Sequence, residues 1–232
     1  MISVGEFKTA QLKYSRVREA YKTKEQTLRV EFENTGLQFG KHSILLRAFK
    51  QEKEVELWVK NTNQVYILFK TYTVCAASGA LGPKRKMGDY QVPEGYYHID
   101  RFNPQSNFYL SLGLNYPNAS DRILSDFKSP GGDIFIHGYC ASIGCLAMTD
   151  DRIKEIYVVA VEAINSGQSA IPVYIYPFRM TNLNIEIASK ELEKDKSLLS
   201  FWSNLKVGFD YFEKSKKTPI VSVNKKGEYL FR

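Results

Sequence analysis

The chain is poor in the features that anchor a protein in a membrane or crosslink a small fold. None of its apolar runs approaches the roughly 20 residues that a membrane-spanning helix needs, so no transmembrane segment is expected. Cysteine is scarce, with three residues in 232, and an odd number leaves at least one thiol outside any intrachain disulfide. Stability must therefore come mainly from a hydrophobic core, which a chain of this length with 44% hydrophobic residues can form.

Basic residues exceed acidic ones. There are 32 lysines and arginines against 25 acidic residues, a net charge of +7 that raises nucleic acid as a partner. The basic residues are scattered along the chain and no recognised DNA or RNA motif occurs, so no nucleic-acid partner is expected. The densest cluster is Lys84-Arg85-Lys86. Such a cluster is either a solvated loop or a basic lip that attracts carboxylates.

The clearest chemical pattern is the segment 133–150, which reads DIFIHGYCASIGCLAMTD. Three apolar residues predict a short buried strand that ends at His137, and Gly138 then allows the chain to turn. Cys145 follows eight positions after the histidine, behind a run of mostly small residues. A thiol is a nucleophile only as thiolate, and a neighbouring imidazole can take its proton. The pattern predicts a Cys145 nucleophile with His137 as general base and acid.

The oxyanion that such a thiol generates needs N–H donors. The small residues before Cys145 allow the backbone to fold closely around it, and we expect the N–H groups of Ile143, Gly144 and Cys145 to serve. The second ring nitrogen of His137 needs an acceptor that fixes the tautomer, either a backbone carbonyl or a carboxylate. No metal or cofactor is expected.

Spacing alone leaves other interpretations open. His137 and Cys145 can be inert core residues, since free cysteine is commonly buried. His137, Cys140 and Cys145 offer three zinc ligands, but their spacing matches no common structural zinc pattern. A disulfide between Cys140 and Cys145 is also possible, and Cys75, at the end of an apolar run, is expected to be a buried hydrophobic residue.

Two motifs together resemble a known family. IHGYCASIGCLAMTD is similar to the active-site signature of the L,D-transpeptidase (YkuD-type) catalytic domain family, and KRKMGDYQVPEGYYHI resembles its upstream glycine and Pro-x-Gly motif. The signature falls on His137, Gly138, Ser142, Gly144 and Cys145. NPQSNFYLSLGLNYPN and the C-terminal FWSNLKVGFDYFEKSKKTPIVSV extend the similarity to the YafK-like branch, from about Ser43 to Phe231. Ile143 departs from the histidine or arginine that is common at its position in the family, which leaves substrate preference open.

The resemblance implies a function. The chain would be a peptidoglycan-modifying cysteine acyltransferase that attacks the third residue of a tetrapeptide stem and forms an acyl-enzyme. The alternatives are a hydrolase or amidase of the same mechanism that cleaves lipoprotein–peptidoglycan links, and a non-catalytic peptidoglycan-binding module. The expected partners are peptidoglycan stem peptides and a peptidoglycan-anchored lipoprotein. We expect substrate contacts from Gly138, Ser142, Tyr139, Arg85 and Tyr109.

The resemblance also implies a location in the periplasm or cell envelope. The N-terminus lacks the apolar core of a signal peptide, and we expect that an export signal has been removed.

The pattern of the chain predicts a mixed α+β fold. It comprises a mostly-β L,D-transpeptidase-like sheet or barrel, flanking helices and a C-terminal α/β appendage. We expect an N-terminal helical segment (1–42), a catalytic domain (43–180) and an appendage (181–232) packed on it. Helices are predicted at 15–34, from 149 or 150 to 166 and at 198–215, and strands at 44–50, 55–60, 65–74, 95–101, 134–136, 171–178 and 220–223. The Pro- and Gly-containing stretch 103–132 is predicted to be a long loop.

Overall fold

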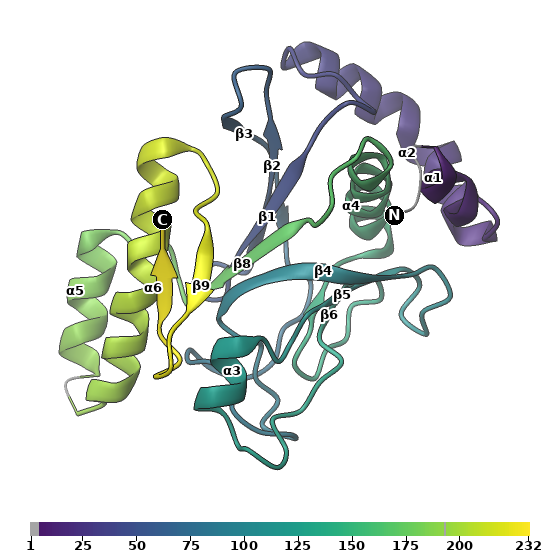
Figure 1. Ribbon diagram of the computed structural model, residues 1–232. Coiled ribbons are helices and arrows are strands. Elements are labelled where there is room, and N and C mark those ends of the chain that lie inside the picture. Colours follow the sequence, from purple (N-terminus) through teal and green to yellow (C-terminus); the bar gives the residue numbers. More distant parts are fainter. Residues whose placement is uncertain (1–4, 193) are drawn as a thin grey trace.

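The computed structural model describes residues 5–192 and 194–232, so the first four residues of the predicted N-terminal segment lie outside the described part. One mixed sheet, bent along its length, forms the centre, with helices on both faces (Figure 1). Its strands are β1 (Ile44–Phe49), β2 (Glu54–Lys60), β3 (Tyr66–Thr73), β4 (Gly95–Asn103), β5 (Ser111–Leu114), β6 (Phe135–His137), β7 (Leu146–Ala147) and β8 (Pro172–Tyr176). The predicted mixed α+β class is confirmed.

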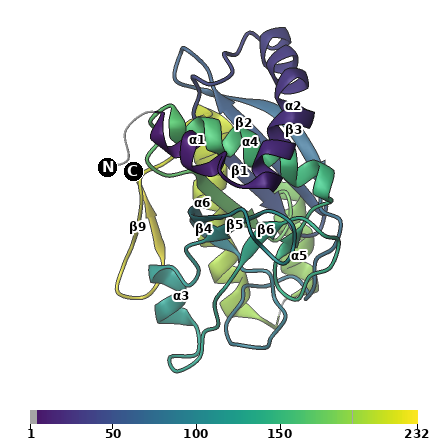
Figure 2. The same ribbon diagram turned by 90° about the vertical axis from the view of Figure 1, so that its right-hand side faces the viewer.

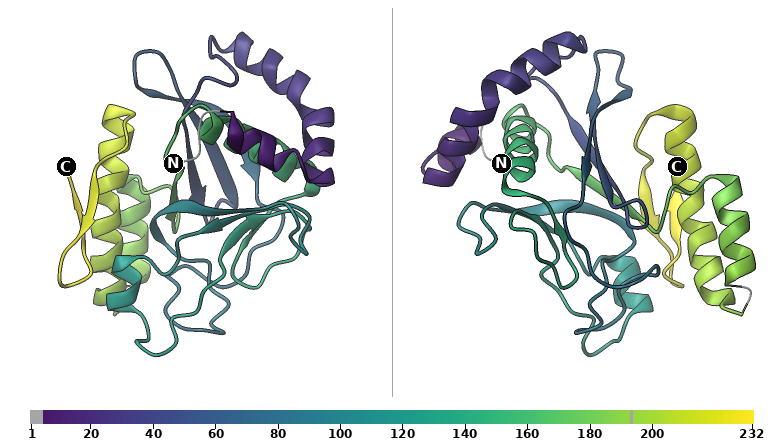
Figure 3. Two further views of the ribbon diagram at one scale, coloured as in Figure 1. Left: turned by 45° about the vertical axis from the view of Figure 1, so that its right-hand side comes forward. Right: turned by 180° about the vertical axis from the view of Figure 1, so that it is seen from behind.

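The strands are hydrogen-bonded in the order β3-β2-β1-β8-β4-β5-β6-β7. The β1–β8 and β6–β7 pairs are parallel and the others antiparallel. Figure 3 shows β1 to β3 rising away from the layer that β4 to β6 form. The strand order places β6 and β7, which carry the chemical motif, at one end of the sheet.

Both faces of the sheet are covered at β1, because every residue of this strand is buried. Successive side chains of a strand point to opposite faces. Ile44, Leu46 and Ala48 belong to one core and Leu45 and Phe49 to another. The sheet therefore separates two hydrophobic cores.

The first core lies under the N-terminal helices and α4. Figure 2 shows α1 (Glu6–Gln11), α2 (Ser15–Asn34) and α4 (Asp150–Asn165) grouped on one side of the molecule. Helix α4 begins after Thr149, whose hydroxyl accepts the Arg152 N–H. The helices predicted at 15–34 and after Thr149 are present.

The C-terminal residues cover the second core. They form α5 (Asn182–Glu191), α6 (Lys196–Ser215) and the hairpin β9 (Val221–Val223) with β10 (Tyr229–Phe231). Trp202, Leu205 and Phe212 of α6 are buried against aromatic residues of the sheet. Figure 1 shows this segment on the side of the sheet away from α2 and α4.

The prediction of a long loop at 103–132 is wrong for two parts of that stretch. Ser111–Leu114 forms β5, a fully buried strand between β4 and β6, and Ala119–Leu124 forms α3. Asn118 and Asp121 cap α3 reciprocally, each side chain accepting the other's backbone N–H. The prolines and glycines around these short elements concealed them. In the described part of the chain, no helix is long and apolar enough to cross a bilayer.

Candidate active site

The sheet brings His137 and Cys145 to one face. His137 is the last residue of β6, and Cys145 directly precedes β7. These strands are parallel with Ile136 opposite Leu146, which puts Cys145 level with Phe135. Residues two apart on a strand share a face, so the thiol and the imidazole project to the same side. Both line one cavity of about 630 Å³.

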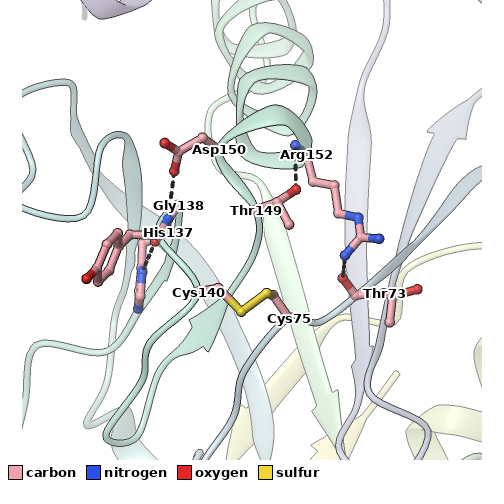
Figure 4. The surroundings of a disulfide bond; sticks show 9 residues. Thr73, Cys75, His137, Gly138, Cys140, Thr149, Asp150 and Arg152 are labelled. Carbon is pink, nitrogen blue, oxygen red and sulfur yellow. Dashed lines mark hydrogen bonds between the residues drawn. A yellow bond between two sulfur atoms is a disulfide. The ribbon is translucent and has the colours of Figure 1, made fainter.

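The tautomer of His137 is fixed by its neighbour. The ring is 2% exposed, and Nδ1 lies 2.5 Å from the Gly138 carbonyl oxygen (Figure 4). A carbonyl only accepts, so Nδ1 carries the hydrogen and Nε2 keeps its lone pair. Burial lowers the pKa of His137, which the Gly138 contact partly offsets. The imidazole is therefore neutral near pH 7, with Nε2 able to accept a proton.

The Cys145 thiol is held by the strand beside it. Its sulfur accepts the Phe135 N–H at 3.4 Å, and the thiol donates to the Asp133 carbonyl oxygen at 3.7 Å. Burial raises the pKa of Cys145, and the Asp133 carboxylate adds to the rise, while the Phe135 N–H and the Lys84 charge oppose it. The resting pair is a neutral thiol and a neutral imidazole.

The turn before Cys145 is held by Ser142. The serine hydroxyl accepts the Cys145 N–H at 2.8 Å and donates to the Cys145 carbonyl at 2.7 Å. The Cys145 N–H, which the sequence suggested as an oxyanion donor, is thus already bonded. Gly144 has φ +120°, a conformation that favours glycine. Ile143 lies at the cavity with its side chain 78% exposed.

The turn after His137 is fixed by α4. The Tyr139 N–H donates to Asp150 Oδ1 at 2.7 Å, and the Gly138 N–H donates to the Leu110 carbonyl. A Cβ on Gly138 would lie 2.7 Å from the same Asp150 oxygen, so only glycine allows this approach. The sequence predicts Asp150 only at the start of a helix, and nothing in its spacing signals the contact with the turn.

A disulfide joins Cys75 and Cys140 (Figure 4), whose Cα atoms are 5.4 Å apart. Cys145 is the free cysteine. The expectation that Cys75 is a buried hydrophobic residue is therefore wrong, and so is a Cys140–Cys145 bridge. Residues 75–76 pair with Ala147, which lies in the same segment as Cys140. This pairing brings the sulfur atoms of Cys75 and Cys140 together. This pairing between distant segments could not be read from spacing. Because Cys140 is in a disulfide, it cannot supply a thiolate to the zinc site that the sequence left open.

Three segments line the cavity: the loop wall (residues 82–90), residues 103–111, and residues 131–145, of which 137–145 form the nucleophile wall. Of the residues expected to contact substrate, Ser142 lines the cavity. The other four, Gly138, Tyr139, Arg85 and Tyr109, are not among the lining residues. Arg85 instead pairs with Asp121 at 3.4 Å.

The aromatic and charged lining residues differ from those expected. Tyr109 lies beneath Arg16 and Lys154, on the side of α2 and α4. Phe108, one position earlier, lines the cavity with its ring centroid 4.6 Å from that of His137. In the basic cluster it is Lys84 that lines the cavity, paired with Asp89 at 2.6 Å. The sequence alone does not show which of two adjacent residues, Phe108 or Tyr109 and Lys84 or Arg85, has its side chain in the cavity.

Comparison with known proteins identifies the family. Residues 48–175 match the YkuD family model, described as the L,D-transpeptidase catalytic domain. The chain belongs to this family. An Escherichia coli K12 protein named "Putative L,D-transpeptidase YafK" is 41% identical over 182 residues, 78% of this chain and 70% of that protein. The O157:H7 protein of the same name matches equally. The resemblance read from the sequence is confirmed.

Two solved structures also match this L,D-transpeptidase family member, at lower sequence identity. The helical cell shape determining protein Pgp2 from Campylobacter jejuni has a TM-score of 0.47 and 16% identity, covering 80% of this chain and 74% of that one. Bd1075 from Bdellovibrio bacteriovorus has a TM-score of 0.42 and 18% identity, covering 79% and 75%.

Proposed function

We propose that the protein is a peptidoglycan-modifying cysteine acyltransferase that acts on the third residue of tetrapeptide stems. The observation that carries the proposal is the pairing of a free Cys145 thiol with a neutral His137 that has one tautomer, in the same cavity. Membership of the L,D-transpeptidase family supports the substrate class.

The chemistry follows from the two neutral groups. The Cys145 proton passes to His137 Nε2 as the sulfur attacks the carbonyl of the third residue. The tetrahedral intermediate collapses, the bond to the terminal D-alanine breaks, and the imidazolium returns its proton to the leaving amine. An acceptor amine then attacks the thioester and releases the thiol. Backbone N–H groups of Ile143 and Gly144 stabilise the oxyanion, each typically worth about 3 kcal/mol.

The cavity mouth favours a second candidate acting through the same thiol. Met87, Tyr90, Phe108 and Ile143 line the cavity with side chains 68%, 58%, 43% and 78% exposed. Exposed apolar clusters are typical of surfaces that bind a protein. This favours a donor whose stem peptide is joined to a polypeptide, such as a peptidoglycan-anchored lipoprotein, with water as acceptor.

The cell envelope is the proposed location. The Cys75–Cys140 disulfide supports it, because disulfides persist in oxidising compartments. Family membership supports it independently, since L,D-transpeptidases act on the cell wall.

The test is product analysis by mass spectrometry. The protein is incubated with a disaccharide-tetrapeptide, alone and with an excess of a diamino acid. Exchange of the terminal D-alanine for the diamino acid supports transfer, and a tripeptide product supports hydrolysis. If neither forms, a stem peptide joined to a polypeptide is supplied next. No product from either donor would contradict the proposal.

A further inference from the structure

Glu94 is a fully buried carboxylate at the base of the loop wall. It is 0% exposed and follows Val92 and Pro93 just before β4. Its Oε1 accepts from Lys50 Nζ at 3.0 Å and from the Gly82 N–H at 2.7 Å. Its Oε2 accepts from the Trp202 indole N–H at 2.8 Å. An isolated buried charge is very costly, so these donors stabilise one arrangement.

Lys50 binds the backbone at both ends of the same loop. It directly follows β1, and its Nζ also donates to the carbonyls of Gly82 at 2.6 Å and Val92 at 2.9 Å. Gly82 therefore bonds this ion pair through both its N–H and its carbonyl. Since Gly82 is the first residue of the loop wall and Val92 lies two positions after its last, the Lys50–Glu94 pair fixes both ends of the segment.

Helix α6 supplies the third partner and lies along the loop. Besides Trp202, Phe201 contacts the loop wall, with its ring centroid 4.9 Å from the Arg85 guanidinium carbon. A Cβ built on Gly82 would lie 4.0 Å from both methyl groups of Leu198. Leu198 and Phe201 of α6 thus reach the loop wall itself, and Trp202 reaches Glu94 beyond its end.

The loop wall in turn shapes the cavity. Lys84, Met87 and Tyr90 line it. The Gln91 carbonyl oxygen would lie 3.3 Å from a Cβ on Gly144, so the loop also packs against the turn that carries the nucleophile.

We propose that Glu94, Lys50 and Trp202 are positioning residues through which the C-terminal helix α6 holds the loop wall in its substrate-binding position. The C-terminal appendage (181–232) would then influence substrate affinity through the position of the loop wall, although α6 itself lies outside the cavity. The link itself follows from the contacts, and its effect on turnover rests on the proposed function.

A second buried glutamate provides a matched control. Glu56 Oε2 accepts from the Trp58 indole N–H at 2.7 Å and from Arg47, which also pairs with Glu213 of α6 at 2.7 Å. This cluster also joins the sheet to α6, but within the described part of the chain its hydrogen bonds and ion pairs do not reach the loop wall. Trp58→Phe and Trp202→Phe each remove one indole N–H from one buried glutamate, at the same interface.

Amide hydrogen exchange measured by mass spectrometry on the full chain tests the link without substrate. Loss of a buried hydrogen-bond partner destabilises the segment that it holds, so Trp202→Phe should speed exchange in peptides covering 82–92 by about tenfold. Trp58→Phe should leave those peptides unchanged. Unchanged exchange in Trp202→Phe, or equal acceleration in both variants, would overturn the proposal.

A milder variant keeps the test decisive if Trp202→Phe does not fold. Phe201→Leu removes the ring beside Arg85 at a half-buried position. It should also speed exchange in 82–92, and wild-type exchange there would overturn the link.

Kinetics tests the effect on substrate. With the stem-peptide donor, Trp202→Phe should raise KM by about fivefold, because the displaced loop wall binds substrate less tightly. The kcat should stay within about twofold of the wild-type value. Cys145 alkylation by iodoacetamide should keep its wild-type rate, and Trp58→Phe should keep its KM. A wild-type protein without turnover would contradict the proposed function, whereas hydrogen exchange would still decide the link. Unchanged KM in an active Trp202→Phe would overturn the positioning role.

Discussion

The two walls of the cavity are stabilised in different ways. The nucleophile wall (137–145) is anchored in adjacent strands, by the Asp150 contact at the start of α4 and by the Cys75–Cys140 disulfide. The loop wall (82–90) has no strand of its own and depends on the buried Lys50–Glu94 pair and on α6. Cys145 and His137, the groups proposed to perform the chemistry, lie on the strand-anchored wall. The wall that lines the cavity for substrate depends on distant parts of the chain.

This difference separates reaction from recognition. Changes in the nucleophile wall should alter the reactivity of Cys145, and changes in the loop wall should alter substrate affinity. The same fold can therefore vary its substrate with little effect on its thiol, to which the loop wall contributes the Lys84 charge.

The largest effect is expected from the reacting groups themselves. Cys145→Ala removes the nucleophile and His137→Ala removes its base, and each should lower kcat by about a thousandfold or more. Turnover of the stem peptide measures both. Circular dichroism should match the wild type, and normal turnover of folded Cys145→Ala would contradict the assigned role.

Removing the disulfide should weaken the nucleophile wall and the fold together. The bridge joins residues 65 positions apart, and a loop of that size corresponds to about 4 kcal/mol of unfolding free energy in the chain-entropy model. The paired variant Cys75→Ser with Cys140→Ser should therefore unfold at lower urea concentration. The control is the wild type with dithiothreitol, which should show the same loss. A loss below about 1 kcal/mol would mean that the bridge contributes little.

The Asp150 contact should affect rate more than stability. Asp150→Ala frees the Tyr139 N–H and the turn after His137, and a misplaced base should lower kcat by about tenfold. Asp151→Ala is the control, because Asp151 lies in the same first turn of α4 and pairs with Lys24 at 2.6 Å. Both variants lose one negative charge at the helix start. Equal rates in the two would contradict a role for the Asp150 contact.

The smallest effect concerns the pH dependence of the thiol. Burial raises the pKa of Cys145, so the thiolate fraction and the alkylation rate should rise with pH and level off only above the ordinary cysteine pKa of about 8.5. The Asp133 carboxylate contributes to the rise, so Asp133→Asn should move the midpoint to lower pH by a few tenths of a unit. Iodoacetamide rates between pH 6 and 10 measure this. A midpoint that moves to higher pH would contradict the contribution of Asp133.

The low-pH limit of turnover should come from His137. Burial lowers the pKa of this imidazole, so it stays neutral at pH 7, and activity should fall only as the pH drops through that lowered value.

Sequence predicted the parts of the site that local patterns encode. The strand before His137, the free thiol and the helix after Thr149 follow from apolar runs, cysteine count and a capping residue, which act over a few positions. The disulfide, the Asp150 contact and the Glu94 link join residues far apart in the chain, and no spacing rule describes such pairs. Phe108 and Lys84 were missed in favour of Tyr109 and Arg85, because the direction of a loop side chain depends on the backbone of the folded chain.

The most direct test of the central claim is to trap the acyl-enzyme. The wild type is mixed with the stem tetrapeptide without an amine acceptor, quenched in acid within milliseconds to seconds, digested and mapped by mass spectrometry. We expect an adduct with the mass of the donor minus D-alanine on the peptide that contains Cys145, and its absence in Cys145→Ala. D-alanine release without an adduct at any time point, or an adduct on another residue, would contradict the mechanism.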